Sequence, residues 1–185
     1  MHTRAIVGVR TAAVTALALV AMPFEARAQA PAPPSCEELD VHRQWDFWVG
    51  EWDVVVNDST RTPAGTNTIT SMHAGCMLHE SWRSAGGGTG SSTNFYDGAR
   101  GVWRQVWVAP AYVIEIEGGL DDEGAMVLEG ELRTFVSGSV SPFRGIWTEL
   151  EDGVVNQRFE IQNAETGEWT VWFDGLYLRK ETRTP

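Results

Sequence analysis

The chain has 185 residues, 14 of them basic and 25 acidic, and its formal net charge is −11. So acidic a surface repels phosphate groups, which argues against nucleic acid or an anionic membrane as a partner. The length fits one domain after an N-terminal segment, and nine tryptophans give that domain an unusually large content of aromatic surface.

Residues 1–30 have the pattern of a cleaved bacterial signal peptide. Two arginines precede an apolar run over residues 11–22, and residues 28–30 form a small-x-small cleavage site. The apolar run is too short to span a bilayer comfortably. The sequence therefore predicts a secreted or periplasmic protein that leaves the membrane after cleavage. Residues 31–34 are then a proline-rich linker, and residues 35–185 form the single domain.

A short helix is expected to follow the linker and to close one end of the domain. Ser35 is placed to cap it, with Glu37 and Glu38 in the first turn, where acidic side chains are favourable. The helix should end near Trp45 or Phe47.

The two cysteines, Cys36 and Cys76, are expected to form a disulfide, as isolated pairs usually do in an oxidising compartment. Such a bond adds roughly 3–4 kcal/mol by restricting the unfolded chain. Two buried thiols or a reactive cysteine are the alternatives. A metal site of His73, Cys76 and His79 is a further alternative, but the spacing matches no usual zinc pattern and strand alternation separates Cys76 from both histidines. No metal and no other cofactor is expected.

After the helix, short alternating runs are separated by turns such as Asp97-Gly98 and Asp152-Gly153. Consecutive strands with tight turns make an antiparallel meander, and closure removes its exposed edges. The sequence therefore predicts an all-β, antiparallel up-and-down barrel of about ten strands. The expected strands are 51–56, 66–72, 76–83, 91–96, 102–108, 112–117, 125–131, 143–149, 154–161 and 169–179.

The first and last strands carry a recognisable pair of signals. Gly50 and Trp52 form a G-x-W in the first strand, and Arg179 lies at the end of the last. This is similar to the calycin, or lipocalin-like, pattern, in which the tryptophan packs beneath an arginine of the last strand through a cation–π contact. The resemblance implies structural roles for Gly50, Trp52 and Arg179.

Further segments extend the similarity over nearly the whole domain. The chain resembles a family of secreted bacterial proteins of unknown function with calycin-like barrels. The resemblance implies the fold but supplies no activity and no catalytic residues. The segments that carry it are 47–52, 75–82, 94–97, 103–108 and 174–177.

Strand alternation predicts which side chains face the barrel interior. Each inward set mixes large rings with one or two polar groups, which suits a small hydrophobic or amphiphilic ligand. Alternatively, the polar groups satisfy one another in a filled barrel, and the protein acts through its surface as an extracytoplasmic interaction protein. The residues expected to bind the ligand are Glu80, Trp82, Asn94, Tyr96, Trp103, Gln105 and Trp107.

Among these residues, Glu80 has the clearest chemical potential. A carboxylate on a tryptophan-lined face has a raised pKa, which permits general acid–base catalysis. With Tyr96 it could serve an isomerase or cyclase type of reaction, as an alternative to binding without catalysis. The simpler alternative is a salt bridge from Glu80 to Arg104 or Arg144. Nucleophile and phosphate-loop motifs are absent, and no catalytic residue is assigned.

Overall fold

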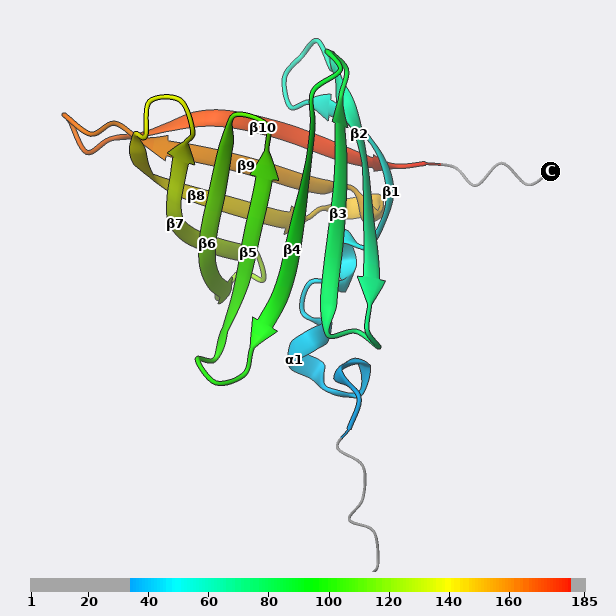
Figure 1. Cartoon of the computed structure of the whole chain (residues 1–185). Helices are drawn as coiled ribbons and strands as arrows, with labels where there is room; N and C mark the ends of the chain where they lie inside the picture. The colour runs from blue at the N-terminus through cyan, green and yellow to red at the C-terminus, as the bar shows by residue number, and fades with distance from the viewer. Residues whose placement is uncertain (1–33, 181–185) are drawn as a thin grey trace, which may run out of the picture. The chain divides into compact units, whose positions relative to one another are not determined.

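Alternating apolar and polar residues between short turns form ten antiparallel strands (Figure 1) in the computed structural model, which describes residues 34–180. Each strand pairs with the next along the chain, and the last pairs with the first, which closes the barrel. The predicted all-β up-and-down barrel is thereby confirmed, and the architecture is consistent with a calycin-like barrel. The strands are β1 (Gly50–Val56), β2 (Pro63–Met72), β3 (Met77–Ser84), β4 (Thr89–Asp97), β5 (Val102–Ala109), β6 (Tyr112–Leu120), β7 (Met126–Thr134), β8 (Val140–Glu149), β9 (Val155–Gln162) and β10 (Trp169–Arg179).

Several strands extend beyond the runs expected from alternation. Strand β2 begins at Pro63, three residues earlier than predicted, and pairs there with Val55 beside an irregularity in the register of β1. Proline is tolerated at the first residue of a strand and next to a bulge, because no ladder hydrogen bond is lost there. The strand therefore continues past the point where its sequence pattern stops.

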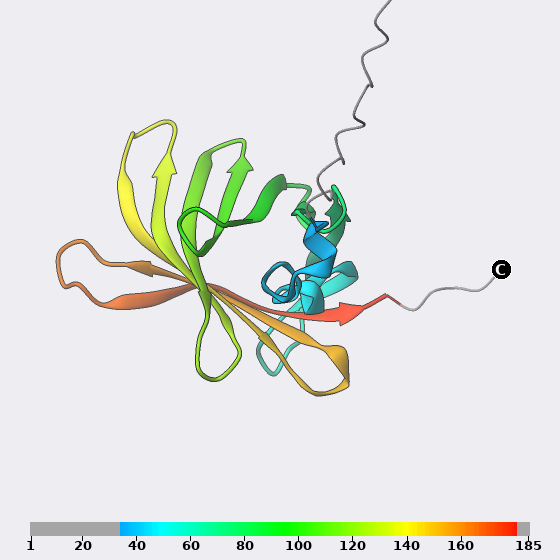
Figure 2. The same ribbon diagram turned by 90° about the horizontal axis from the view of Figure 1, so that it is seen from below.

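The N-terminal segment forms three short turns rather than the single helix predicted. These are the 3-10 turn η1 (Cys36–Glu38), the helix α1 (Asp40–Arg43) and the 3-10 turn η2 (Asp46–Trp48). The helix is interrupted because the backbone at Leu39 is extended, with φ −105° and ψ 119°. The segment lies at the end of the barrel that carries the β2–β3 and β4–β5 turns (Figures 1 and 2), which is called the closed end below.

The predicted disulfide is confirmed and fixes this segment to the β2–β3 turn. Cys36 is bonded to Cys76, and the Glu37 backbone N–H donates to the Ala74 carbonyl at 2.9 Å. The turn is tight: Ala74 has a φ of 52° and Gly75 a φ of 82°. A Cβ at Gly75 would lie 2.9 Å from the Glu37 nitrogen, so only glycine allows the two segments to approach so closely.

A second connection joins the last strand to the first. The guanidinium carbon of Arg179 lies 4.4 Å from the centre of the Trp52 ring, and its nitrogens donate to the carbonyls of Val49 at 3.1 Å and Phe47 at 3.3 Å. Gly50 has a φ of 148°, and a Cβ there would lie 2.7 Å from Arg179 Nη1. The cation–π contact expected from the G-x-W pattern is therefore present, and glycine leaves room for it.

The predicted signal peptide, residues 1–30, and nearly all of the predicted linker lie outside the described residues. Within residues 34–180, no helix is long and apolar enough to cross a bilayer. The predicted domain limits remain a prediction, and residues 34–180 supply every strand of the barrel.

Candidate functional site

The barrel interior changes character along its axis, and the closed end is filled by rings. Five tryptophans there are at most 1% exposed. Two come from the N-terminal segment: Trp45 stacks on Trp48 with 5.2 Å between ring centres and meets Trp147 of β8 at 4.8 Å. Trp147 is the third of the five, and Trp52 and Trp103 are the other two. Rings packed at these distances exclude a ligand from this end.

Two residues predicted to bind the ligand lie in this filled region. The Trp103 indole N–H donates to Gln44 Oε1 at 3.0 Å. Tyr96 meets Trp103 at 6.1 Å and His42 at 5.6 Å, edge to face in both cases. Both residues face inward, as alternation predicts, but they pack against the N-terminal segment.

A hydrogen-bonded polar belt crosses the middle of the barrel, formed by Asn67, Glu80, Ser92, Asn94 and Gln105, each at most 2% exposed. Asn67 Nδ2 and Ser92 Oγ each donate to one Glu80 oxygen at 2.6 Å. Asn94 Nδ2 donates to Ser92 Oγ at 2.8 Å, and Gln105 Nε2 donates to Asn94 Oδ1 at 2.7 Å. The belt joins strands β2 to β5, and two of its donors, Asn67 Nδ2 and Ser92 Oγ, point at the carboxylate.

Burial raises the pKa of Glu80 from 4.5 to about 7, and the hydrogen bonds from Ser92 and Asn67 oppose the rise. Desolvation is the larger effect because removing a carboxylate from water disfavours its charged form. At neutral pH the group is therefore divided between its protonated and ionised states, which is the condition for transferring a proton or for responding to a charged ligand.

The expected salt bridge from Glu80 to Arg104 or Arg144 is wrong. Arg104 lies 3.8 Å from Glu117 and 4.0 Å from Asp97, while Arg144 lies 2.5 Å from Glu160. Both arginines occupy positions of opposite parity to the buried residues of their strands, and so they face outward. No cation of residues 34–180 lies within 4.0 Å of Glu80, which leaves its charge without a partner of opposite sign.

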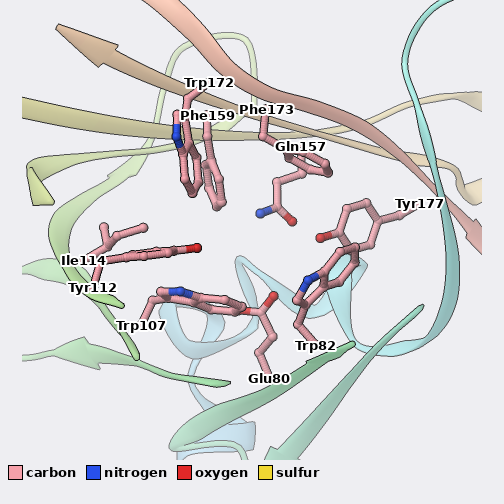
Figure 3. A pocket seen from close by; sticks show the side chains of 10 residues that line it. All are labelled: Glu80, Trp82, Trp107, Tyr112, Ile114, Gln157, Phe159, Trp172, Phe173 and Tyr177. Atoms are coloured by element: carbon pink, nitrogen blue, oxygen red, sulfur yellow. The ribbon is translucent and has the colours of Figure 1, made fainter. Parts of the chain in front are cut away.

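Beyond the polar belt, at the open end of the barrel, lies an aromatic cavity of about 230 Å³ (Figure 3). It opens to solvent beside Trp172, whose side chain is partly exposed. Seven of its ten lining residues are aromatic, and only Glu80 and Gln157 add carboxyl or amide groups. The lining residues are Glu80, Trp82, Trp107, Tyr112, Ile114, Gln157, Phe159, Trp172, Phe173 and Tyr177.

Two glycines that face the interior leave room for the indole rings of Trp107 and Trp82. A Cβ at Gly90 would lie 2.2 Å from the Trp107 ring, and one at Gly65 would lie 2.7 Å from the Trp82 ring. Each indole therefore lies against bare backbone of a neighbouring strand, as aromatic side chains do over glycines in sheets. The rings line the wall of the cavity because these two positions carry no side chain.

A bulge in β10 adds a ring to the cavity. The register against β9 shifts between Val171 and Phe173, so Trp172 is an extra residue in the ladder. Its ring meets Tyr112 at 5.6 Å and Phe159 at 6.2 Å. Regular alternation would place Trp172 and Phe173 on opposite faces, whereas the bulge lets both line the cavity.

Of the seven residues predicted to bind the ligand, Glu80, Trp82 and Trp107 line the cavity. Asn94 and Gln105 belong to the polar belt, and Tyr96 and Trp103 to the closed end. The prediction missed the cavity residues of β6, β9 and β10. Alternation could have found Tyr112, Gln157 and Tyr177, because each shares parity with buried neighbours on its strand.

Hydroxyl and amide groups complete the wall. Tyr177 OH accepts a hydrogen bond from Asn67 Nδ2 at 3.2 Å, and burial and the nearby Glu80 charge raise its pKa well above 10. Burial likewise raises the pKa of Tyr112. Both tyrosines are therefore neutral near pH 7. Gln157 Oε1 is buried and accepts no hydrogen bond from the described residues.

The alternative metal site is wrong, because the Cys76 sulfur is used in the disulfide. Nowhere in residues 34–180 do three His, Cys, Asp or Glu side chains gather as metal ligands would. A scan against protein-family models finds no match, and a search of the curated proteins finds no relative. The geometry of the cavity is therefore the basis for a functional conclusion.

Proposed function

We propose that this protein is a secreted calycin-like barrel that binds a small, largely apolar molecule in the aromatic cavity, without catalysis. The observation that carries the proposal is the contrast between a filled closed end and about 230 Å³ of space among seven rings at the open end. A cavity of about 150 Å³ lined by apolar side chains binds benzene, so this one has room for a ligand of one or two rings.

The composition of the wall supports this function. Binding sites for small molecules are typically apolar and aromatic, with a few polar groups that orient the ligand. In this cavity, Glu80 and Gln157 are the polar groups placed to orient a ligand. The open cavity weighs against the alternative of a filled barrel that acts only through its surface.

The cellular location is part of the proposal. The signal-peptide pattern of residues 1–30 and the Cys36–Cys76 disulfide both favour an oxidising compartment outside the cytoplasm. The Trp52–Arg179 contact supports assignment to the calycin-like barrels. The acidic charge favours a small molecule over nucleic acid or an anionic membrane as the partner.

An enzyme using the same cavity is the second candidate, and the pKa of about 7 at Glu80 favours it. Tyr96 lies at the closed end, so a hydroxyl partner for Glu80 would be Tyr112 or Tyr177. The variant Glu80→Gln separates the two functions. It should leave the affinity for a neutral ligand within a few fold if the protein only binds, and abolish turnover if Glu80 transfers a proton.

The first test is native mass spectrometry of the protein purified from its own secreting host. The expected result is a mass above that of the bare chain, lost on denaturation, which also identifies the ligand class. The second test titrates the purified protein with 2-phenylethanol and follows tryptophan fluorescence and the melting temperature.

The matched variants for this titration are Ile114→Phe and Val108→Phe. Ile114 lines the cavity and is 1% exposed, whereas Val108 faces solvent and is 52% exposed. Filling the cavity should abolish binding, and the outer ring should leave binding unchanged. Wild-type binding by Ile114→Phe would contradict the proposed site.

A further inference from the structure

The aromatic cavity has an electrostatic bias that its size does not explain. Glu80 is the single carboxylate among the described residues that line it, and none of these residues is Lys, Arg or His. The two tyrosine hydroxyls are neutral near pH 7. A ligand in this cavity therefore meets one negative group and no positive one.

The hydrogen-bonding groups have the same bias. Each Glu80 oxygen accepts one hydrogen bond from the polar belt, although a carboxylate oxygen can accept two. Gln157 Oε1 and, next to Glu80, Asn67 Oδ1 are buried and accept none from the described residues. One indole donor of the wall, Trp107 Nε1, is likewise buried without a partner among the described residues. The acceptors nearest the carboxylate are those that a ligand with several N–H donors would satisfy.

The rings around the carboxylate favour the same charge. In Figure 3 the Glu80 carboxylate points into the space between Trp82 and Trp107, with the other rings facing the same space. The face of an aromatic ring attracts a cation within about 6 Å of its centre, most strongly for tryptophan, and aromatic cages bind ammonium groups in this way.

We infer that the aromatic cavity selects a small organic cation, a protonated amine on an aromatic or short aliphatic body, with Glu80 as its counter-ion. The inference rests on the proposed function, because it names the ligand class of the same cavity. The ammonium group contacts Glu80 at the polar belt, and the body of the ligand lies among the rings towards the open end. An anionic ligand would face an unpaired carboxylate and is excluded.

Binding of such a cation depends on pH through Glu80. The other groups that face Glu80 are Asn67 of β2, Ser92 of β4, and the tyrosines Tyr112 of β6 and Tyr177 of β10. Of these, only the tyrosines titrate, and they do so well above neutral pH. The affinity for an amine should therefore rise with pH until Glu80 is ionised and then remain constant.

Calorimetric titration of the secreted protein with three probes of similar shape tests the inference: 2-phenylethylammonium, neutral 2-phenylethanol and anionic phenylacetate. We expect the amine to bind at least about tenfold more tightly than the alcohol, and phenylacetate not to bind. Between about pH 5.5 and about pH 8.5 the amine affinity should rise on the order of tenfold, while that of the alcohol stays within about twofold.

Two variants that each remove one negative charge give the matched comparison. Glu80→Gln should lose the preference for the amine and its pH dependence, so that the amine and the alcohol bind with similar affinity. Glu129→Gln, on the outer face beside Arg144, should behave as wild type. Circular dichroism and the melting temperature show whether each variant is folded.

The outcomes separate the two claims. If the alcohol binds as tightly as the amine, or if Glu80→Gln keeps the amine preference, the cation inference is overturned and the proposed binding function stands. If none of the three probes binds at millimolar concentration, both claims are overturned.

Discussion

At the closed end of the barrel, Trp45 and Trp48 of the N-terminal segment complete a cluster of five tryptophans that are at most 1% exposed. At the open end, Trp82, Trp107 and Trp172 surround empty space. The two ends use the same residue type, yet one forms a solid core and the other forms a wall.

The difference lies in what each end receives besides its own strands. The closed end receives two rings from a segment that a disulfide and the Glu37–Ala74 hydrogen bond attach to it. Within residues 34–180, no comparable segment enters the open end. Gly65 and Gly90 allow the indoles of Trp82 and Trp107 to lie against the barrel wall, which leaves the barrel axis free. An aromatic-rich barrel therefore becomes a container when rings lie along the wall, and a core when rings enter from outside.

The largest effect should come from breaking the closed end. Trp48→Ala removes a fully buried ring and leaves a void, so we expect the free energy of unfolding to fall by roughly 3–5 kcal/mol. Trp107→Ala at the open end removes a partly exposed ring that borders a cavity and should lower it by under about 2 kcal/mol. Urea unfolding measures both, and equal losses would refute the contrast between the two ends.

A pH series should give the next largest effect. Because the pKa of Glu80 is about 7 in the folded protein and 4.5 ordinarily, the folded state holds a proton that the unfolded state has released between these values. The contribution of Glu80 to the stability of the ligand-free protein should therefore fall by about 3 kcal/mol as the pH rises from about 4.5 to about 7, and be constant above that range.

This effect is measured as the difference between wild type and Glu80→Gln in urea unfolding at each pH. The glutamine has the same shape and does not titrate, so the surface charges cancel in the comparison. A difference that does not change with pH would show that Glu80 titrates as it would in water.

The smallest of the three effects concerns the connection across the closed end. Arg179→Ala should lower the free energy of unfolding by roughly 1–3 kcal/mol, through lost packing on Trp52 and two lost hydrogen bonds to backbone carbonyls. Arg179→Lys should recover only part of the loss, because an ammonium group cannot match the planar contact. Thermal unfolding measures both variants, and a melting temperature unchanged by alanine would contradict a stabilising role.

The sequence predicts the barrel well because strands with one buried face must alternate, and ten such runs were visible. It also predicts that Glu80, Asn94 and Gln105 face inward. It could not divide these residues between a polar belt and a cavity, because alternation gives the face of a strand but not the depth along the axis. The salt bridge predicted for Glu80 was wrong for a different reason, which alternation itself supplies: both arginines lie between inward-facing positions and so face outward.

The rest of the cavity depends on local departures from regular structure. Trp172 lines it only because a bulge shifts the parity of β10, and no short-range signal marks that position. The N-terminal helix is broken at Leu39, three residues after the cysteine that attaches this segment to a distant part of the chain at Cys76. Such features arise from long-range contacts, which a pattern within one strand or one helix does not contain.

The bulge in β10 also has a consequence for how such a barrel diversifies. Trp172 is the extra residue in the ladder, because its neighbours Val171 and Phe173 pair with two consecutive residues of β9, Glu160 and Phe159. Loss of its single codon would remove one ring from the entrance and leave every other side chain on its present face. Insertions and deletions usually disrupt a sheet, but the deletion of Trp172 would instead widen the entrance of the cavity. The deletion variant should therefore bind bulkier ligands than the wild type.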